Sequence, residues 1–146
     1  MLILVLGCKA YTEPATAPLG VNGIEVKIQT DQRAYSFSSD SRVHVSMANV
    51  GTEPVYAPLP SFFVRLEIQR ERDWQALGAW YGILAVAPRV VPFLTGDTLP
   101  ADLPLTSSVL RSPGVYRFVY EVYEDSELSR LLPRRLLLSN AFEIVE

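Results

Sequence analysis

The chain has 146 residues, of which 49% are apolar and 20% are charged, and its formal net charge is −3. A chain of this length forms one domain with a real core, because folding removes about two thirds of its unfolded surface from water. The composition excludes an intrinsically disordered protein. The 13 basic residues are scattered and are outnumbered by 16 acidic ones, so nucleic acid is excluded as a partner.

The chain opens with an unbroken apolar run that ends in Gly7 and the only cysteine, Cys8. A single cysteine excludes an intrachain disulfide and a CxxC metal site. The arrangement resembles the lipobox of bacterial lipoproteins, in which the cysteine after a small residue receives a diacylglycerol and becomes the mature N-terminus. The resemblance implies that residues 1–7 are a truncated lipoprotein signal, since no basic residue precedes Cys8.

Residues 8–22 are rich in proline, threonine and alanine, which is typical of a flexible tether ahead of a folded domain at 23–146. Two acyl chains are enough for stable anchoring. This interpretation predicts a membrane partner, reached through the lipid, and a domain that faces the periplasm or the cell exterior. The alternative is that residues 1–7 form a buried N-terminal strand.

Alternating apolar and polar residues predict the strands that follow in chain order. The alternation is clear at 24–29, 42–47, 63–69, 115–123 and 141–145, and weaker strands are expected at 54–57, 74–77 and 98–105. In the second segment, Val43, Val45 and Met47 are expected to point into the core, and in the third Glu67 is expected to point outward. The one helical candidate is 126–132, which ends at Pro133.

Turn sequences separate these segments, notably Asn22-Gly23 and Ser112-Pro113-Gly114. Many short strands with almost no helix indicate a sandwich or a barrel. The order and spacing of three motifs resemble the bacterial immunoglobulin-like domains of envelope lipoproteins, which are similar in outline to the BsuPI-type intracellular proteinase inhibitors. These motifs are 43–56, 94–98, and 112–118 with the last strand at 139–144.

The resemblance implies an all-β, immunoglobulin-like antiparallel β-sandwich of about seven to eight strands. It further implies that Tyr116 takes the role of the tyrosine corner, its hydroxyl returning to nearby backbone. No antibody-like disulfide is possible, so Phe118 and its neighbours must fill that position by packing. The resemblance implies no catalytic residue.

Little else in the sequence points to chemistry. His44 is the only histidine and is expected to be exposed. A hydrolytic dyad of His44 with Asp40 is disfavoured, because the sequence has no nucleophile elbow. Copper binding by His44 and Met47 is disfavoured, because the two side chains face opposite sides of one strand. Four acidic residues are candidate calcium ligands without EF-hand spacing: Glu121, Glu124, Asp125 and Glu127. A solvated loop that pairs with Arg130, Arg134 and Arg135 is the alternative interpretation. We therefore predict no catalytic residue, no metal and no cofactor.

The segment 74–94 is unusual, because Arg89 is its only charge and it does not alternate cleanly. Either it is a long crossover that covers the sandwich, or it exposes an aromatic patch that binds a protein partner. The residues of that patch would be Trp74, Trp80, Tyr81 and Arg89.

These observations predict a non-enzymatic binding or scaffolding module of the bacterial cell envelope. The first alternative is a proteinase inhibitor that acts through loops at one end of the sandwich.

Overall fold

The computed structural model describes residues 20–37, 42–59, 64–79, 89–104 and 112–146. Within these residues the chain forms strands and one 3₁₀ helix, η1. The elements are β1 (Val26–Thr30), β2 (Ala34–Ser36), β3 (Arg42–Asn49), β4 (Val55–Leu59), β5 (Arg65–Arg70), β6 (Asp73–Ala79), β7 (Arg89–Phe93), β8 (Thr98–Pro104), β9 (Gly114–Val119), η1 (Arg134–Leu136) and β10 (Phe142–Val145). No helix of this part of the chain is long and apolar enough to cross a membrane.

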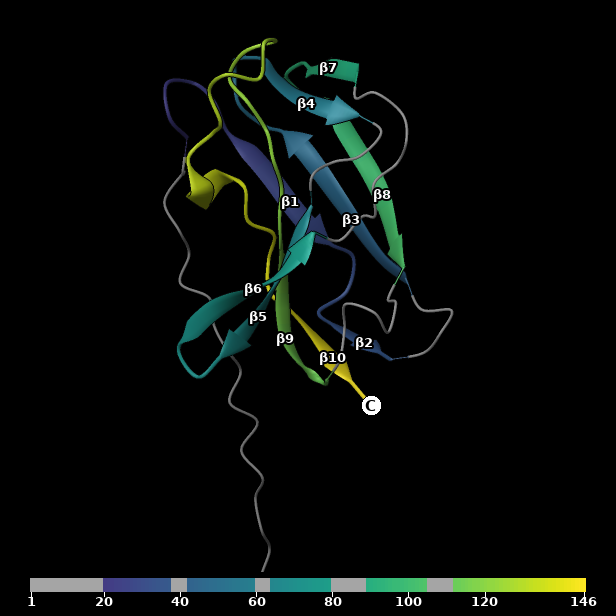
Figure 1. Cartoon of the computed structure of the whole chain (residues 1–146). Coiled ribbons are helices and arrows are strands. Elements are labelled where there is room, and N and C mark those ends of the chain that lie inside the picture. The colour runs from purple at the N-terminus through teal and green to yellow at the C-terminus, as the bar shows by residue number, and fades with distance from the viewer. Residues whose placement is uncertain (1–19, 38–41, 60–63, 80–88, 105–111) are drawn as a thin grey trace, which may run out of the picture.

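Two sheets form the body of the domain (Figure 1). One has the order β1-β3-β8 and the other β2-β10-β9-β5-β6, while β4 and β7 form a separate pair. The first order matches strands A-B-E of an immunoglobulin domain, and the part β10-β9-β5-β6 of the second matches G-F-C-C′, with β3 as B and β9 as F. All strand pairs are antiparallel except β2 with β10. The fold is an immunoglobulin-like all-β sandwich, as predicted.

The alternation in the sequence places the core between the sheets. Val43, Val45 and Met47 of β3 are buried and face the buried residues of the other sheet, among them Leu66 and Phe118. Each large apolar side chain buried in this way contributes about 1.5–3 kcal/mol. The core therefore joins both sheets into one cooperative unit.

Aromatic side chains pack together on the neighbouring strands β9 and β10, and the fully buried Phe118 among them lies two residues after Tyr116, where the second cysteine of an antibody domain would be. Phe118 of β9 stacks on Phe142 of β10, with ring centroids 5.0 Å apart, and the ring of Tyr116 lies 6.2 Å from that of Phe142. The Tyr116 hydroxyl donates a hydrogen bond to the carbonyl of Ser112, just before β9. This is the bond of a tyrosine corner, which confirms the role that the resemblance implied.

Close backbone contact joins the start of β1 to the loop after β3. The residues Asn22 and Gly23 have φ angles of 51° and 80°, as a type I′ turn requires, and Val21 and Ile24 exchange two hydrogen bonds of 2.9 Å. Gly51 packs so closely on this turn that a Cβ atom would lie 2.4 Å from the Gly23 carbonyl oxygen. The approach is possible only because residue 51 has no side chain.

The buried Asn49 at the end of β3 orders the same loops. Its side-chain amide donates to the carbonyls of Glu53 and Phe93 at 2.8 and 2.9 Å, and its oxygen accepts from the Gly51 N–H at 3.1 Å. Every polar atom of this side chain is thus used, as burial demands. One asparagine therefore connects the end of β3 to the segment just before β4 and to the last residue of β7.

The eight predicted strands are confirmed, and the described residues contain ten strands rather than seven to eight. Sequence reasoning missed β2, which has only three residues, and β7, whose Pro92 interrupts the strand pattern. The segment 74–94 begins with β6 and ends with β7, and its central part lies outside the described residues.

The helix predicted at 126–132 is wrong. The backbone forms a turn there instead, because Leu128 has a φ of 55°. The Asp125 carboxylate accepts hydrogen bonds from the N–H groups of Glu127, Ser129 and Arg130 at 3.0, 3.1 and 2.8 Å. Bonds of this kind compete with the helical pattern.

Candidate functional site

The structure describes two of the predicted partner-binding residues, and they stand in different sheets. Trp74 lies half-buried in β6, at the edge of the five-stranded sheet. Arg89 is exposed at the start of β7, which pairs only with β4 among the described strands. Trp80, Tyr81 and Cys8 lie outside the described residues. The described residues of the predicted patch are therefore Trp74 and Arg89.

Trp74 holds a cation on its ring. The guanidinium carbon of Arg117, from β9, lies 4.0 Å from the centroid of the indole. A contact of this geometry contributes about 0.5–2 kcal/mol, depending on how far the pair is removed from water. Arg117 is mostly buried, with a side chain that is 16% exposed. The tryptophan thus packs on the outer face of the sheet.

The carboxylate of Glu67 lies at the centre of this face. The Nε of Arg117 donates a hydrogen bond to the Glu67 Oε2 at 2.8 Å. Arg134, which stands in the 3₁₀ helix η1, donates a hydrogen bond to the Glu67 Oε1. We call Glu67, Trp74, Arg117 and Arg134 the arginine–tryptophan cluster. Two positive charges on one carboxylate compensate for the loss of water that burial imposes.

Glu67 was predicted to point outward, and that is only half correct. It lies on the outer face of β5, yet its residue is only 4% exposed because Arg117 and Arg134 cover it. Burial alone would raise the pKa of the Glu67 carboxyl. The hydrogen bonds from Arg134 and Arg117 outweigh that effect and hold the pKa below its ordinary value of 4.5.

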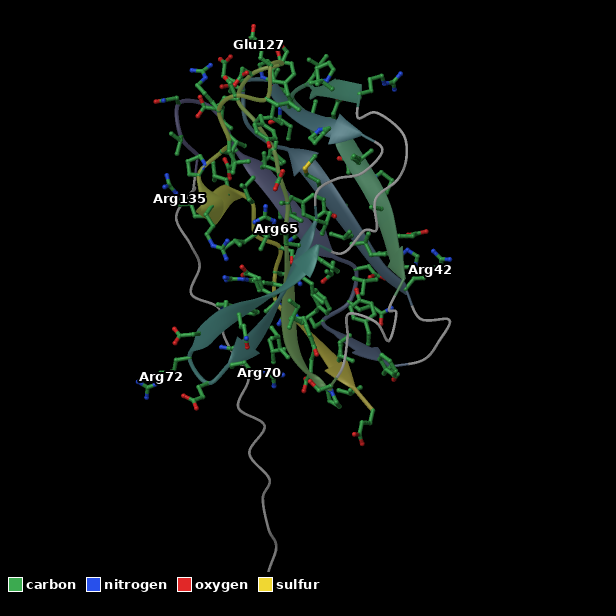
Figure 2. The ribbon with its side chains drawn as sticks, in the orientation of Figure 1. Arg42, Arg65, Arg70, Arg72, Glu127 and Arg135 are labelled. Carbon is green, nitrogen blue, oxygen red and sulfur yellow. The ribbon has the colours of Figure 1, made fainter. Side chains whose placement is uncertain are left out.

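Arg134 brings a distant part of the chain onto the sheet. It stands in η1, inside the long connection between β9 and β10, and the buried Leu136 and Leu137 beside it fix this connection in the core. Figure 2 shows Arg135 at this side of the molecule, Arg65 on the sheet, and Arg70 and Arg72 at the tip of the β5–β6 hairpin. The connection thus holds the guanidinium of Arg134 against Glu67 of β5.

The exposed charged group of the cluster is the guanidinium of Arg134. The carboxylate is fully engaged by two guanidinium groups and has a lowered pKa, so it is a poor proton acceptor at neutral pH. Arg134 remains 58% exposed, and a guanidinium has five N–H donors, of which the contact with Glu67 uses a part. The outward-facing groups of the cluster are thus suited to bind acidic or carbonyl groups of a partner.

His44 is exposed, as predicted, and has a partner that the sequence did not suggest. Its Nδ1 contacts the carboxylate of Asp102, which lies directly across from it in β8. Both side chains are 56% exposed, so the pair is a surface interaction of at most about 1 kcal/mol. Asp40, the candidate partner of His44 in a dyad, lies outside the described residues.

The acidic residues after β9 pair with arginine. Arg130 lies 3.6 Å from both Glu124 and Asp125, and Arg65 contacts Glu121 at 3.0 Å. Desolvation opposes ionisation of Asp125, but the N–H groups of Ser129 and Arg130 hold its pKa below the usual value. Among the residues that the structure describes, no group of acidic residues, histidines or cysteines has the geometry of a metal site.

Comparison with known proteins gives no family. No family model matches the chain, and no curated protein matches it. The chain is similar to two solved structures of a β-glucosidase from Listeria innocua, in complex with glucose and with gluconolactone. The identities are 12% and 14%, the TM-scores are 0.36 and 0.37, and the match covers 84% of this chain but only 16% of each glucosidase. A likeness at this level carries no argument about function.

Proposed function

We propose that this protein is a non-enzymatic, immunoglobulin-like lipoprotein domain that acts as a binding or scaffolding module in the bacterial cell envelope. The observation that carries the proposal is the apolar run ending in Gly7-Cys8, placed ahead of a sandwich whose first described turn is at Asn22-Gly23. Residues 8–22 would then span the distance from the lipid to the domain.

The proposed partner is a protein, bound at Trp74, Trp80, Tyr81 and Arg89. The half-buried Trp74 supports this, because the cation on its ring and the sheet below hold the indole in one position. Rigid aromatic side chains supply contact area at a low entropic cost, and interface hot spots are enriched in tryptophan, tyrosine and arginine.

Lipid labelling tests the membrane part of the proposal. Produced in a bacterial host, the protein is expected to carry diacylglycerol on Cys8 and to begin at that residue, as mass spectrometry of the N-terminal peptide would show. The Cys8→Ser variant should remain unlabelled. A free thiol on an intact N-terminus would contradict the proposal, and residues 1–7 would then be a structural strand.

Capture from envelope extracts tests the partner patch. The double variant Trp80→Ala, Tyr81→Ala should retain less of the cross-linked partner than the natural chain while melting at the same temperature. A matched control is Phe37→Ala, which removes an exposed aromatic ring that is not part of the patch. A parallel loss of partner and of thermal stability would mean that the two aromatic residues belong to the core.

A second candidate function is proteinase inhibition through the loops at one end of the sandwich. It is favoured by Val50 and Leu94, which are 47% and 59% exposed on loops that Asn49 holds in place. Preorganised loops bind with a smaller loss of entropy. An unlipidated Cys8 would move this function to first place.

A further inference from the structure

Two exposed guanidinium groups lie over neighbouring positions on the outer face of β5. The side chains of Arg65 and Arg134 are 62% and 58% exposed. Arg134 is bonded to Glu67, which stands two residues after Arg65 on the same face of the strand. Positions two residues apart on a strand are separated by about 7 Å. Both arginines therefore reach the same part of the surface.

Both guanidinium groups are held in place and keep further donors. In the described part of the chain, each is bound to a carboxylate through one terminal nitrogen, Arg134 to Glu67 and Arg65 to Glu121 at 3.0 Å. Glu121 also accepts a hydrogen bond from the Tyr123 hydroxyl at 3.3 Å. A guanidinium has five N–H donors in a planar fork that matches a carboxylate. The exposed side of each fork is thus available to an anion.

The charges around these two arginines do not cancel. Glu143, another carboxylate on the outer face, lies across from Val115 of β9, whereas Arg65 lies across from Val119, about 13 Å further along the strand. Four arginines thus meet two glutamates near η1: Arg65, Arg117, Arg134 and Arg135 against Glu67 and Glu121. Four minus two leaves an excess of two positive charges on a chain whose net charge is −3. This local excess favours a negatively charged ligand.

The surroundings of the arginines favour an acidic segment of a protein over other anions. Trp74 is joined to them through Arg117, whose guanidinium carbon lies 4.0 Å from the centroid of the indole. The half-buried ring offers an apolar contact to a neighbouring side chain of the same segment. The 16 acidic residues of the chain repel an extended polyanion such as nucleic acid. A short segment with one or two carboxylates avoids most of this repulsion.

We propose that Arg65 and Arg134 together bind a carboxylate of an acidic segment in a partner protein, and that Trp74 contacts an apolar residue of that segment. The inference rests on the proposed function in taking a protein as the partner. It depends neither on the lipid of Cys8 nor on Trp80 and Tyr81, so the two proposals can fail separately. Pairs between exposed charges are weak, so the segment alone binds weakly and reversibly.

Titration of the isotope-labelled, full-length Cys8→Ser protein with tetraglutamate tests the site by nuclear magnetic resonance. The Nε–H signals of Arg65 and Arg134 should shift and saturate. The signal of Arg42, which Figure 2 shows on the other side of the molecule from Arg135, should stay in place. Equal shifts at all three arginines, or none at Arg65 and Arg134, would overturn the proposal. Inorganic phosphate is titrated in parallel, and tighter binding of phosphate than of tetraglutamate would overturn the assignment to an acidic protein segment.

Two variants with the same loss of charge provide the second test. Arg65→Gln should weaken the binding of tetraglutamate about two- to five-fold. Its melting temperature should stay close to that of the natural chain, because the pair with Glu121 is exposed on the arginine side. Arg42→Gln removes an exposed arginine at the start of β3 and should leave the affinity unchanged. An equal loss of affinity in both variants would mean that net charge governs binding, and this too would overturn the proposal.

Discussion

Replacing Glu67 by alanine should lower the free energy of unfolding by about 3–5 kcal/mol. The substitution leaves the mostly buried Arg117 without its 2.8 Å hydrogen bond and removes the contact that holds Arg134 on the sheet. An unpaired charge that remains away from water costs more than the ion pair itself contributes. Urea denaturation at pH 7 measures the change.

The control for this prediction is Glu121→Ala, which removes the carboxylate that pairs with the 62% exposed Arg65 and should cost at most about 1 kcal/mol. The pH dependence gives a second check. Because the pKa of Glu67 is held below 4.5, its stabilising effect is present above that pH and is lost as the pH falls through the lowered pKa. The difference in the free energy of unfolding between the natural chain and Glu67→Ala should become smaller below pH 4.5. A difference that stays constant with pH would contradict the role of the charge.

Gly51→Ala is expected to destabilise the protein by about 3 kcal/mol. The new methyl group would lie 2.4 Å from the Gly23 carbonyl oxygen and 2.6 Å from the Glu25 nitrogen, both of which are backbone atoms. Relief requires the turn to move, which breaks the hydrogen bonds from Val50 and Gly51 to the Glu25 carbonyl. The melting temperature should fall by about 10 °C or more for a domain of this size.

Gly20→Ala is the matched control, because it is the same substitution at the same end of β1. Its methyl group would meet its nearest atom at 3.5 Å, an ordinary contact. We expect a change within about 1 kcal/mol, since only the unfolded chain is affected. If Gly51→Ala lowers the free energy of unfolding as little as Gly20→Ala does, the clash at residue 51 is relieved without cost and the close approach is unimportant.

The strands were predictable where one face is buried and the other is solvated. Val43, Val45 and Met47 follow that rule, and so do Tyr116 and Phe118. β2 was not predictable, because three residues are too few to show a period. β7 was not predictable, because Pro92 argues against a strand unless that strand pairs on one side only. Local sequence also failed at Leu128, since the hydrogen bonds to Asp125 override the helical pattern there.

The arginine–tryptophan cluster was only partly visible in the sequence. Trp74 was identified from composition, and the period of β5 places Glu67 on the outer face. The pairing of Glu67 with Arg134 joins residues 67 positions apart, and no local pattern specifies such a contact. An acidic residue in an otherwise regular strand, matched by arginines elsewhere, was the signal available, but it does not say which arginine is the partner.

The contact of the Asn22–Gly23 turn with the loop after β3 has a mechanical consequence. A force applied there along β1 acts parallel to the ladder that runs from the pair Val26–Asn49 to the pair Thr30–Val45. Hydrogen bonds loaded in this direction share the force and must break together, whereas bonds loaded across the strands open one after another. The bonds of Val50 and Gly51 to Glu25 reinforce the ladder at the point where the load enters. Of the directions in which β1 can be pulled, the one along its own axis therefore meets the greatest resistance.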